Sequence, residues 1–170
     1  HRADLVIFWG VDPVKTHPRH LERYSVDPAN ERFLPRGKVD RTVIVIDPKQ
    51  TATAELANIH LPIKPGRDFE AIWTLRGLLK GVRPRELAET GLPLEELEKL
   101  AERMKSCRCG VIFFGYGLAR QPLGHRLIEA VLKLTIELNA FTRFHARRMR
   151  MVGDVSGADN VLCWQTGFPF

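Results

Sequence analysis

Glycine, aspartate and basic residues gather at three points where a short apolar run ends. The residues that follow these runs are Gly10, Asp12 and Pro13; then Asp47, Pro48, Lys49 and Thr51; then Gly115, Gly117 and Arg120. Glycine allows a ligand to approach the backbone, a carboxylate accepts from a ribose hydroxyl or a guanine edge, and basic or hydroxyl groups donate to phosphate. The three groups are therefore typical of a nucleotide-binding site.

The same residues also fit ordinary turns, because glycine and proline end strands in many proteins. The chain contains no complete Gly-x-Gly-x-x-Gly motif and no phosphate loop ending in Gly-Lys-Ser/Thr. The residues alone leave both interpretations open.

Histidine and cysteine patterns do not predict a metal site. His17 and His20 are three residues apart and share a helical face, but no carboxylate accompanies them, so hydrogen bonding to the backbone is the favoured interpretation. Cys107, Cys109 and Cys163 are odd in number and lack Cys-x-x-Cys spacing. They also do not form a disulfide framework, which fits a cytoplasmic protein best.

Apolar periodicity predicts the elements that position the three groups. Short strands are expected at residues 5–9, 42–46, 59–63 and 111–114, and helices at residues 17–24, 51–57, 68–80, 93–104 and 124–139. Pro62 confines the third strand to a sheet edge or a strand end, and Asp68 is expected to cap its helix. This alternation predicts an α/β fold, a three-layer Rossmann-like domain with a mainly parallel sheet and ligands at the carboxyl ends of its strands.

Composition is that of a globular protein of 170 residues, with 44% apolar residues and a net charge of +6, and a single domain over residues 1–170 is expected. No apolar run approaches the roughly 20 residues that a membrane helix needs. Four arginines lie among residues 143–150, which we interpret as a solvated face or a subunit contact rather than a nucleic-acid site. The abrupt start at His1 indicates a fragment of a longer subunit.

Five blocks of the sequence resemble one subunit of formylmethanofuran dehydrogenase, the subunit designated B, in the molybdopterin oxidoreductase superfamily. They lie at residues 3–24, with the words His-Pro-Arg-His and Arg-Tyr, at residues 40–54, 56–61 and 113–117, and at residues 161–169, with the words Trp-Gln-Thr-Gly-Phe-Pro. The first and last blocks are specific to this subunit, and together the blocks span nearly the whole chain.

The resemblance implies a domain that holds a guanine-nucleotide tail of a molybdopterin or tungstopterin guanine dinucleotide. Gly10, Asp12 and Pro13 would match one cofactor loop, Asp47 and Pro48 a second, and Gly115 and Gly117 a third, with His17, Lys49, Thr51 and Arg120 beside them. The parent complex would be an oxidoreductase of one-carbon metabolism and methanogenesis that interconverts carbon dioxide and formylmethanofuran. Its other subunits would be the partners, with no nucleic acid and no membrane involved.

Two departures from the family pattern support an alternative. Asp12 replaces an asparagine, and Val152 stands where the family has a histidine. The same type of subunit also serves in a related formyltransferase/hydrolase complex that has lost the cofactor, so the chain would then be a cofactor-free structural subunit. In either case the fragment contains no metal or cluster ligands, and we expect it to be inactive alone with no cofactor bound.

Overall fold

A five-stranded sheet forms the centre of the computed structural model, which describes residues 2–84, 89–150 and 155–168. The strands are β1 (Leu5–Trp9), β2 (Thr42–Ile46), β3 (Ile59–Leu61), β4 (Cys109–Phe114) and β5 (Arg143–Arg148). All pair in parallel, in the order β3-β2-β1-β4-β5. The α/β fold with a parallel sheet is therefore confirmed, and β3 ends before Pro62 at a sheet edge, as expected.

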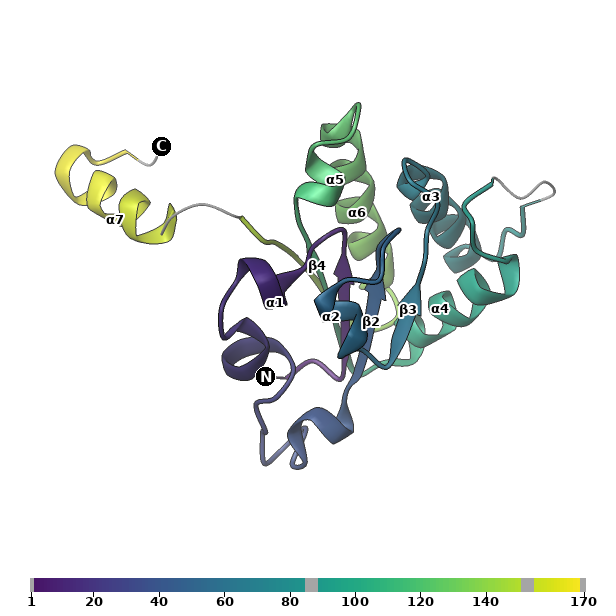
Figure 1. Ribbon diagram of the computed structural model, residues 1–170, viewed down its shortest axis with the longest axis horizontal. Coiled ribbons are helices and arrows are strands. Elements are labelled where there is room, and N and C mark those ends of the chain that lie inside the picture. The colour runs from purple at the N-terminus through teal and green to yellow at the C-terminus, as the bar shows by residue number, and fades with distance from the viewer. Residues whose placement is uncertain (1, 85–88, 151–154, 169–170) are drawn as a thin grey trace.

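The helices lie between these strands along the chain and flank the sheet, apart from α7, which follows β5 (Figure 1). They are α1 (Pro13–Thr16), α2 (Ala52–Glu55), α3 (Asp68–Leu79), α4 (Leu94–Ser106), α5 (Tyr116–Ala119), α6 (Gly124–Leu138) and α7 (Val155–Thr166), with a π-helix at Leu21–Ser25 and a 3-10 helix at Gly37–Asp40. Among the described residues, no helix is both long and apolar enough to cross a bilayer.

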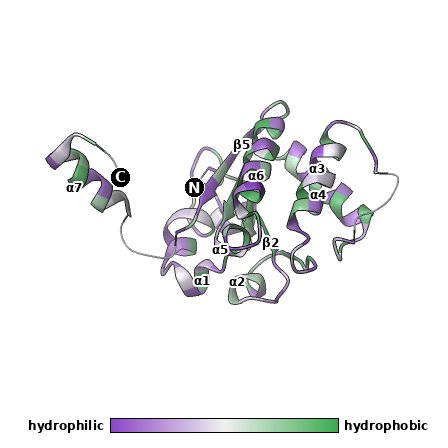
Figure 2. Ribbon diagram, turned by 90° about the horizontal axis from the view of Figure 1, so that it is seen from above, coloured by the Kyte–Doolittle hydropathy of each residue, from purple (hydrophilic) through white to green (hydrophobic). Residues whose placement is uncertain are grey.

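Side chains alternate between the two faces of the sheet, and each face has its own core. On one face, Ile7, Trp9 and Ile112 pack with buried residues of α3, α4 and α6. On the other, Val6 and Phe8 pack with residues of α2 and the segment before β2. Because both faces of β1 are buried, all five residues of this strand are apolar. In Figure 2 the helices that flank the sheet carry both hydrophobic and hydrophilic residues, as expected of helices with one buried face.

The sequence did not predict β5, because its arginines suggested a surface segment. Arg143, His145 and Arg147 are exposed on one face, whereas Phe144 is buried against the core that α6 covers. Buried and exposed side chains alternate along β5 as in any strand, but only one of its two faces is apolar.

Two smaller expectations were also wrong. Residues 17–24 form a turn followed by a π-helix rather than one helix. Asp68 does not cap α3, whose N-cap is Arg67, and its side chain is buried. Trp73 of α3 is 57% exposed and stacks on Phe69. The domain assignment over residues 1–170 stays a prediction; in Figure 1, α7 stands apart from the sheet.

Candidate functional site at the strand ends

The three predicted loops lie together at the carboxyl edge of the sheet. β1 lies between β2 and β4, and Trp9, the last residue of β1, is in register with Ile46 and with Phe114. The three strands therefore end at the same level.

Gly10 and Gly117 bring the first and third loops into backbone contact. The Gly117 N–H donates to the Gly10 carbonyl at 2.9 Å, and Gly10 has a φ of +59°. A Cβ on Gly117 would lie 2.6 Å from the Gly10 carbonyl oxygen, and one on Gly115 would lie 2.9 Å from the Val11 side chain. The close approach that these glycines permit is thus between two loops of the protein.

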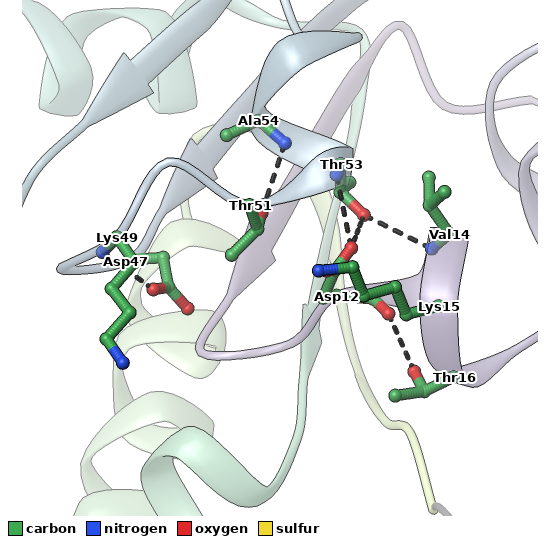
Figure 3. A network of polar contacts seen from close by, with 9 residues as sticks. All are labelled: Asp12, Val14, Lys15, Thr16, Asp47, Lys49, Thr51, Thr53 and Ala54. Carbon is green, nitrogen blue, oxygen red and sulfur yellow. Dashed lines mark hydrogen bonds and ion pairs between the residues drawn. The ribbon is translucent and has the colours of Figure 1, made fainter.

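Asp12 joins the first loop to α2, as Figure 3 shows. Its Oδ1 accepts from the Thr53 backbone N–H at 3.1 Å and from the Thr53 hydroxyl at 2.5 Å. The Thr53 hydroxyl oxygen in turn accepts from the Val14 N–H at 3.2 Å, one residue after Pro13 begins α1. Asp12 Oδ1 is therefore engaged within the protein, and Oδ2 lies 3.9 Å from the Lys15 ammonium.

Asp47 lies in the second loop with one carboxylate oxygen available. Its Oδ1 accepts from the Lys49 N–H at 2.9 Å, whereas no described residue donates to Oδ2. Partial burial, with smaller contributions from the carboxylates of Asp68 and Asp12, raises the pKa of Asp47 above its usual value. Thr51 is the N-cap of α2, and its hydroxyl accepts from the Ala54 N–H. Pro48 and Lys49 are exposed, and the Lys49 ammonium points away from Asp12 (Figure 3).

Arg120 ends the third loop, at the C-cap of α5, with its guanidinium 4.4 Å from the centre of the Tyr116 ring. It is exposed and, among the described residues, forms no ion pair with a carboxylate. It can therefore donate to an anion at this edge.

Asp68 and Gln121 belong to the same edge but were not predicted as site residues. The buried Asp68 carboxylate accepts from the Trp9 indole at 2.7 Å and from the Gln121 amide at 2.7 Å. The same Gln121 amide donates to the Gly117 carbonyl at 2.6 Å. This network links the end of β1, the start of α3 and the third loop. An aspartate at a helix start has a simpler interpretation as a cap, so the sequence carries no signal for this role.

His17 lies beside this edge and is bonded to the backbone, as its favoured interpretation predicts. Its Nε2 is 2.7 Å from the Arg150 carbonyl oxygen, and its Nδ1 is 2.8 Å from the Thr16 hydroxyl. His20 packs edge-on against Phe113, and burial lowers the pKa of its imidazole to about 4. His20 is therefore neutral at neutral pH.

The described part of the chain contains no group of three histidine, cysteine or acidic side chains that could hold a metal ion. Burial raises the pKa of Cys107 to about 12, so its thiol stays protonated. What the edge offers is hydrogen bonding and charge, from Asp47, Thr51, Lys49 and Arg120. These groups are suited to binding a polar or anionic ligand. Val152 lies outside the described residues.

Comparison with known proteins finds relatives over the whole chain, although no family model matches. The first is the subunit designated B of the tungsten-containing formylmethanofuran dehydrogenase 2 of Methanocaldococcus jannaschii, to which the chain is 42% identical over all 170 residues. The same subunit of Methanococcus maripaludis is 39% identical. The chain spans only 39% of the length of each. A nitrate reductase of Shewanella frigidimarina is 37% identical over 79 residues, 46% of this chain and 8% of the reductase.

Two solved structures share the fold. One is the formyltransferase/hydrolase complex (FhcABCD) from Methylorubrum extorquens with methylofuran, with a TM-score of 0.67 and 21% identity, covering 99% of this chain and 42% of that one. The other is acetylene hydratase from Pelobacter acetylenicus, with a TM-score of 0.60 and 18% identity over 82% of this chain and 22% of that one. At these identities the likeness shows the fold alone.

Proposed function

The chain is homologous over its whole length to this subunit of formylmethanofuran dehydrogenase, and from this relationship we propose that it binds the guanine-nucleotide part of a molybdopterin or tungstopterin guanine dinucleotide. The observation that carries the proposal is the meeting of the loops after β1, β2 and β4 at one edge of a parallel sheet. Ligands of open α/β sheets bind at this edge. The homologues are named as tungsten-containing enzymes, which supports a pterin cofactor.

The residues at the edge fit part of such a ligand. Asp47 Oδ2 can accept from a ribose hydroxyl or from the guanine N–H groups. Lys49 and Arg120 are exposed cations suited to the pyrophosphate. Asp12 fits less well, because Thr53 already donates two hydrogen bonds to its Oδ1. Asp12 therefore acts by positioning the first loop against α2.

In the parent complex, the cofactor would supply the redox chemistry that interconverts carbon dioxide and formylmethanofuran. The contribution of this chain is to hold the nucleotide end of the cofactor, with Asp47 as acceptor and Lys49 and Arg120 as donors. The other subunits of that complex are the proposed partners, and the cytoplasm is the proposed location.

The alternative function is that of a structural subunit without cofactor in a formyltransferase/hydrolase complex. One observation favours it: the carboxylate of Asp12, which departs from the family asparagine, is used to connect two parts of the protein itself. Such a subunit would keep the fold of the edge without needing its ligand.

Elemental analysis of the natural subunit, purified with its complex, distinguishes the two functions. The proposal predicts tungsten or molybdenum together with GMP released from the pterin dinucleotide by mild acid hydrolysis. A complex that is intact and active in formyl transfer, but contains neither metal nor releasable GMP, would exclude the cofactor and leave the structural subunit.

A further inference from the structure

A groove lies on one face of the sheet and contains none of the residues of the strand-end loops. This groove has a volume of about 990 Å³ and lies over β4 and β5. Its floor comes from alternate residues of β4, Val111 and Phe113, which belong to the face opposite α6. The remaining lining residues come from β5, from the chain start, from the segment before β2, and from Arg108 and Cys109 where β4 begins; the arginines among them are Arg2, Arg32, Arg108, Arg143 and Arg147.

The groove is strongly cationic. Among the described residues, five arginines line it and no aspartate or glutamate does. Within residues 2–84, 89–150 and 155–168, Arg32, Arg143 and Arg147 form no ion pair with a carboxylate. Arg108 is held by the Phe33 carbonyl at 2.7 Å and lies 3.7 Å from Asp4. Since guanidinium groups of like charge repel one another, an anionic partner would stabilise this arrangement.

Two aromatic rings of the groove, those of Phe33 and Phe113, are already in contact with other groups. The Phe33 ring lies 5.6 Å from the Arg2 guanidinium and 5.4 Å from that of Arg32. Phe113 stacks on Phe8 with ring centres 5.4 Å apart. Binding of single-stranded nucleic acid depends on free ring faces for base stacking. Phe33 and Phe113 offer no free ring face, which leaves the ring of Tyr24, 62% exposed, beside five arginines. This excess of guanidinium groups over rings favours carboxylates with apolar neighbours over stacked bases.

We propose that this groove binds an acidic segment of a partner subunit, whose carboxylates pair with Arg32, Arg143 and Arg147. Arginine forms bidentate pairs with carboxylates, and an apolar floor beneath them suits a peptide that carries both acidic and apolar side chains. The identity of the partner as a subunit of the same complex rests on the proposed function. The groove itself shares no residue with the proposed nucleotide site.

Binding of a labelled acidic peptide tests the groove. The probe is fluorescein-labelled decaglutamate, titrated with the 170-residue chain and followed by fluorescence anisotropy. The groove variant combines Arg143→Glu with Arg147→Glu. The matched control combines Arg103→Glu with Arg126→Glu, two exposed arginines of α4 and α6 on the opposite side of the sheet, and it changes the net charge equally.

We expect the groove variant to bind decaglutamate at least about tenfold more weakly, because it loses two arginines that pair directly with the peptide carboxylates. The control should differ less than about twofold, because its two arginines lie far from the bound peptide. Circular dichroism melting confirms that each variant is folded. Equal weakening by both variants, no binding by the native chain, or tighter binding of a ten-nucleotide uridine RNA than of decaglutamate would each overturn the proposal.

The source of the acidic segment is tested in the assembled complex. Tyr24, which lines the groove and is 62% exposed, is replaced by the photo-crosslinking residue p-benzoylphenylalanine. The proposal expects a crosslink to an acidic stretch of another subunit, located by mass spectrometry. A crosslink only within the same polypeptide, or none, contradicts a partner subunit. If the chain joins no such complex, the proposed function fails, whereas the decaglutamate result still stands.

Discussion

The indole Nε1 of Trp9 donates a hydrogen bond of 2.7 Å to the carboxylate of Asp68, 59 residues further along the chain. Trp9 is 0% exposed and Asp68 is 3% exposed, so neither group can exchange this partner for water. The contact joins the last residue of β1 to the first turn of α3. Through Gln121 it also reaches the third loop of the proposed nucleotide site.

Removal of the Asp68 carboxylate should therefore destabilise the fold. Asp68→Ala leaves the Trp9 N–H buried without an acceptor, which costs about 1–3 kcal/mol of unfolding free energy. Asp68→Asn keeps an acceptor for Trp9 and should cost less. Urea denaturation measures both values. Glu95→Ala, at an exposed position of α4, is the control and should change little. A loss for Asp68→Ala no larger than for Glu95→Ala would show that the contact contributes nothing.

Acid should weaken the fold through His20. The folded pKa of His20 is about 4, against an ordinary value near 6.5, because burial and the neighbouring His17 disfavour the charged imidazolium. The contribution of neutral His20 to the free energy of unfolding is therefore complete above pH 6.5 and is lost as the pH falls toward 4. The reason is that His20 of the unfolded chain takes up a proton at a higher pH than His20 of the folded chain.

His20→Phe removes this proton uptake and keeps a ring against Phe113. We expect the difference in unfolding free energy between pH 7.5 and pH 5 to be smaller in this variant than in the native chain. His125→Asn, at an exposed position of α6, should retain the native difference. An unchanged difference in His20→Phe would be inconsistent with a buried neutral histidine.

Cys107 should resist alkylation in the folded chain. Its pKa of about 12 leaves almost no thiolate at pH 8, because the thiol is partly buried near Asp4. After brief treatment with iodoacetamide, mass spectrometry should find the Cys107 peptide unmodified under native conditions and fully modified in 8 M urea. Rapid modification of Cys107 in the folded chain would show that it has an accessible thiolate and would contradict the expectation.

The 170-residue chain should show no redox activity by itself. The redox chemistry of such enzymes belongs to the cofactor, whereas the described residues of the strand-end site supply hydrogen-bond acceptors and cations. Formylmethanofuran oxidation with an artificial electron acceptor is expected to equal the buffer blank. Turnover that is proportional to the concentration of the purified chain would disprove this expectation.

The sequence predicted those parts of the fold that local pattern determines. β1, β2 and β4 are continuous apolar runs, which indicate buried strands. In α4 the apolar residues recur at helical spacing, as at Leu97, Leu100 and Met104. β5 was missed because Arg143, His145 and Arg147 occupy its exposed face and obscure its single apolar face.

The contacts at the site depend on long-range geometry that no local pattern carries. Asp12 and Thr53 are 41 residues apart, and His17 and Arg150 are 133 apart. The sequence therefore identified the loops that meet, but not that Asp12 Oδ1 is engaged by Thr53 or that Asp68 is a buried acceptor. Gly10 and Gly117 were predicted to let a ligand approach the backbone, whereas in the structure they pack against each other.

Titration of GDP into the chain by isothermal calorimetry, with Asp47→Ala in parallel, tests the central claim most directly. We expect the native chain to bind GDP and Asp47→Ala to bind it about ten- to a hundredfold more weakly, because a charge-assisted hydrogen bond contributes about 1.5–3 kcal/mol. Glu95→Ala should bind like the native chain. Absence of GDP binding, or equal affinity in the native chain and Asp47→Ala, would contradict a guanine-nucleotide site at these strand ends.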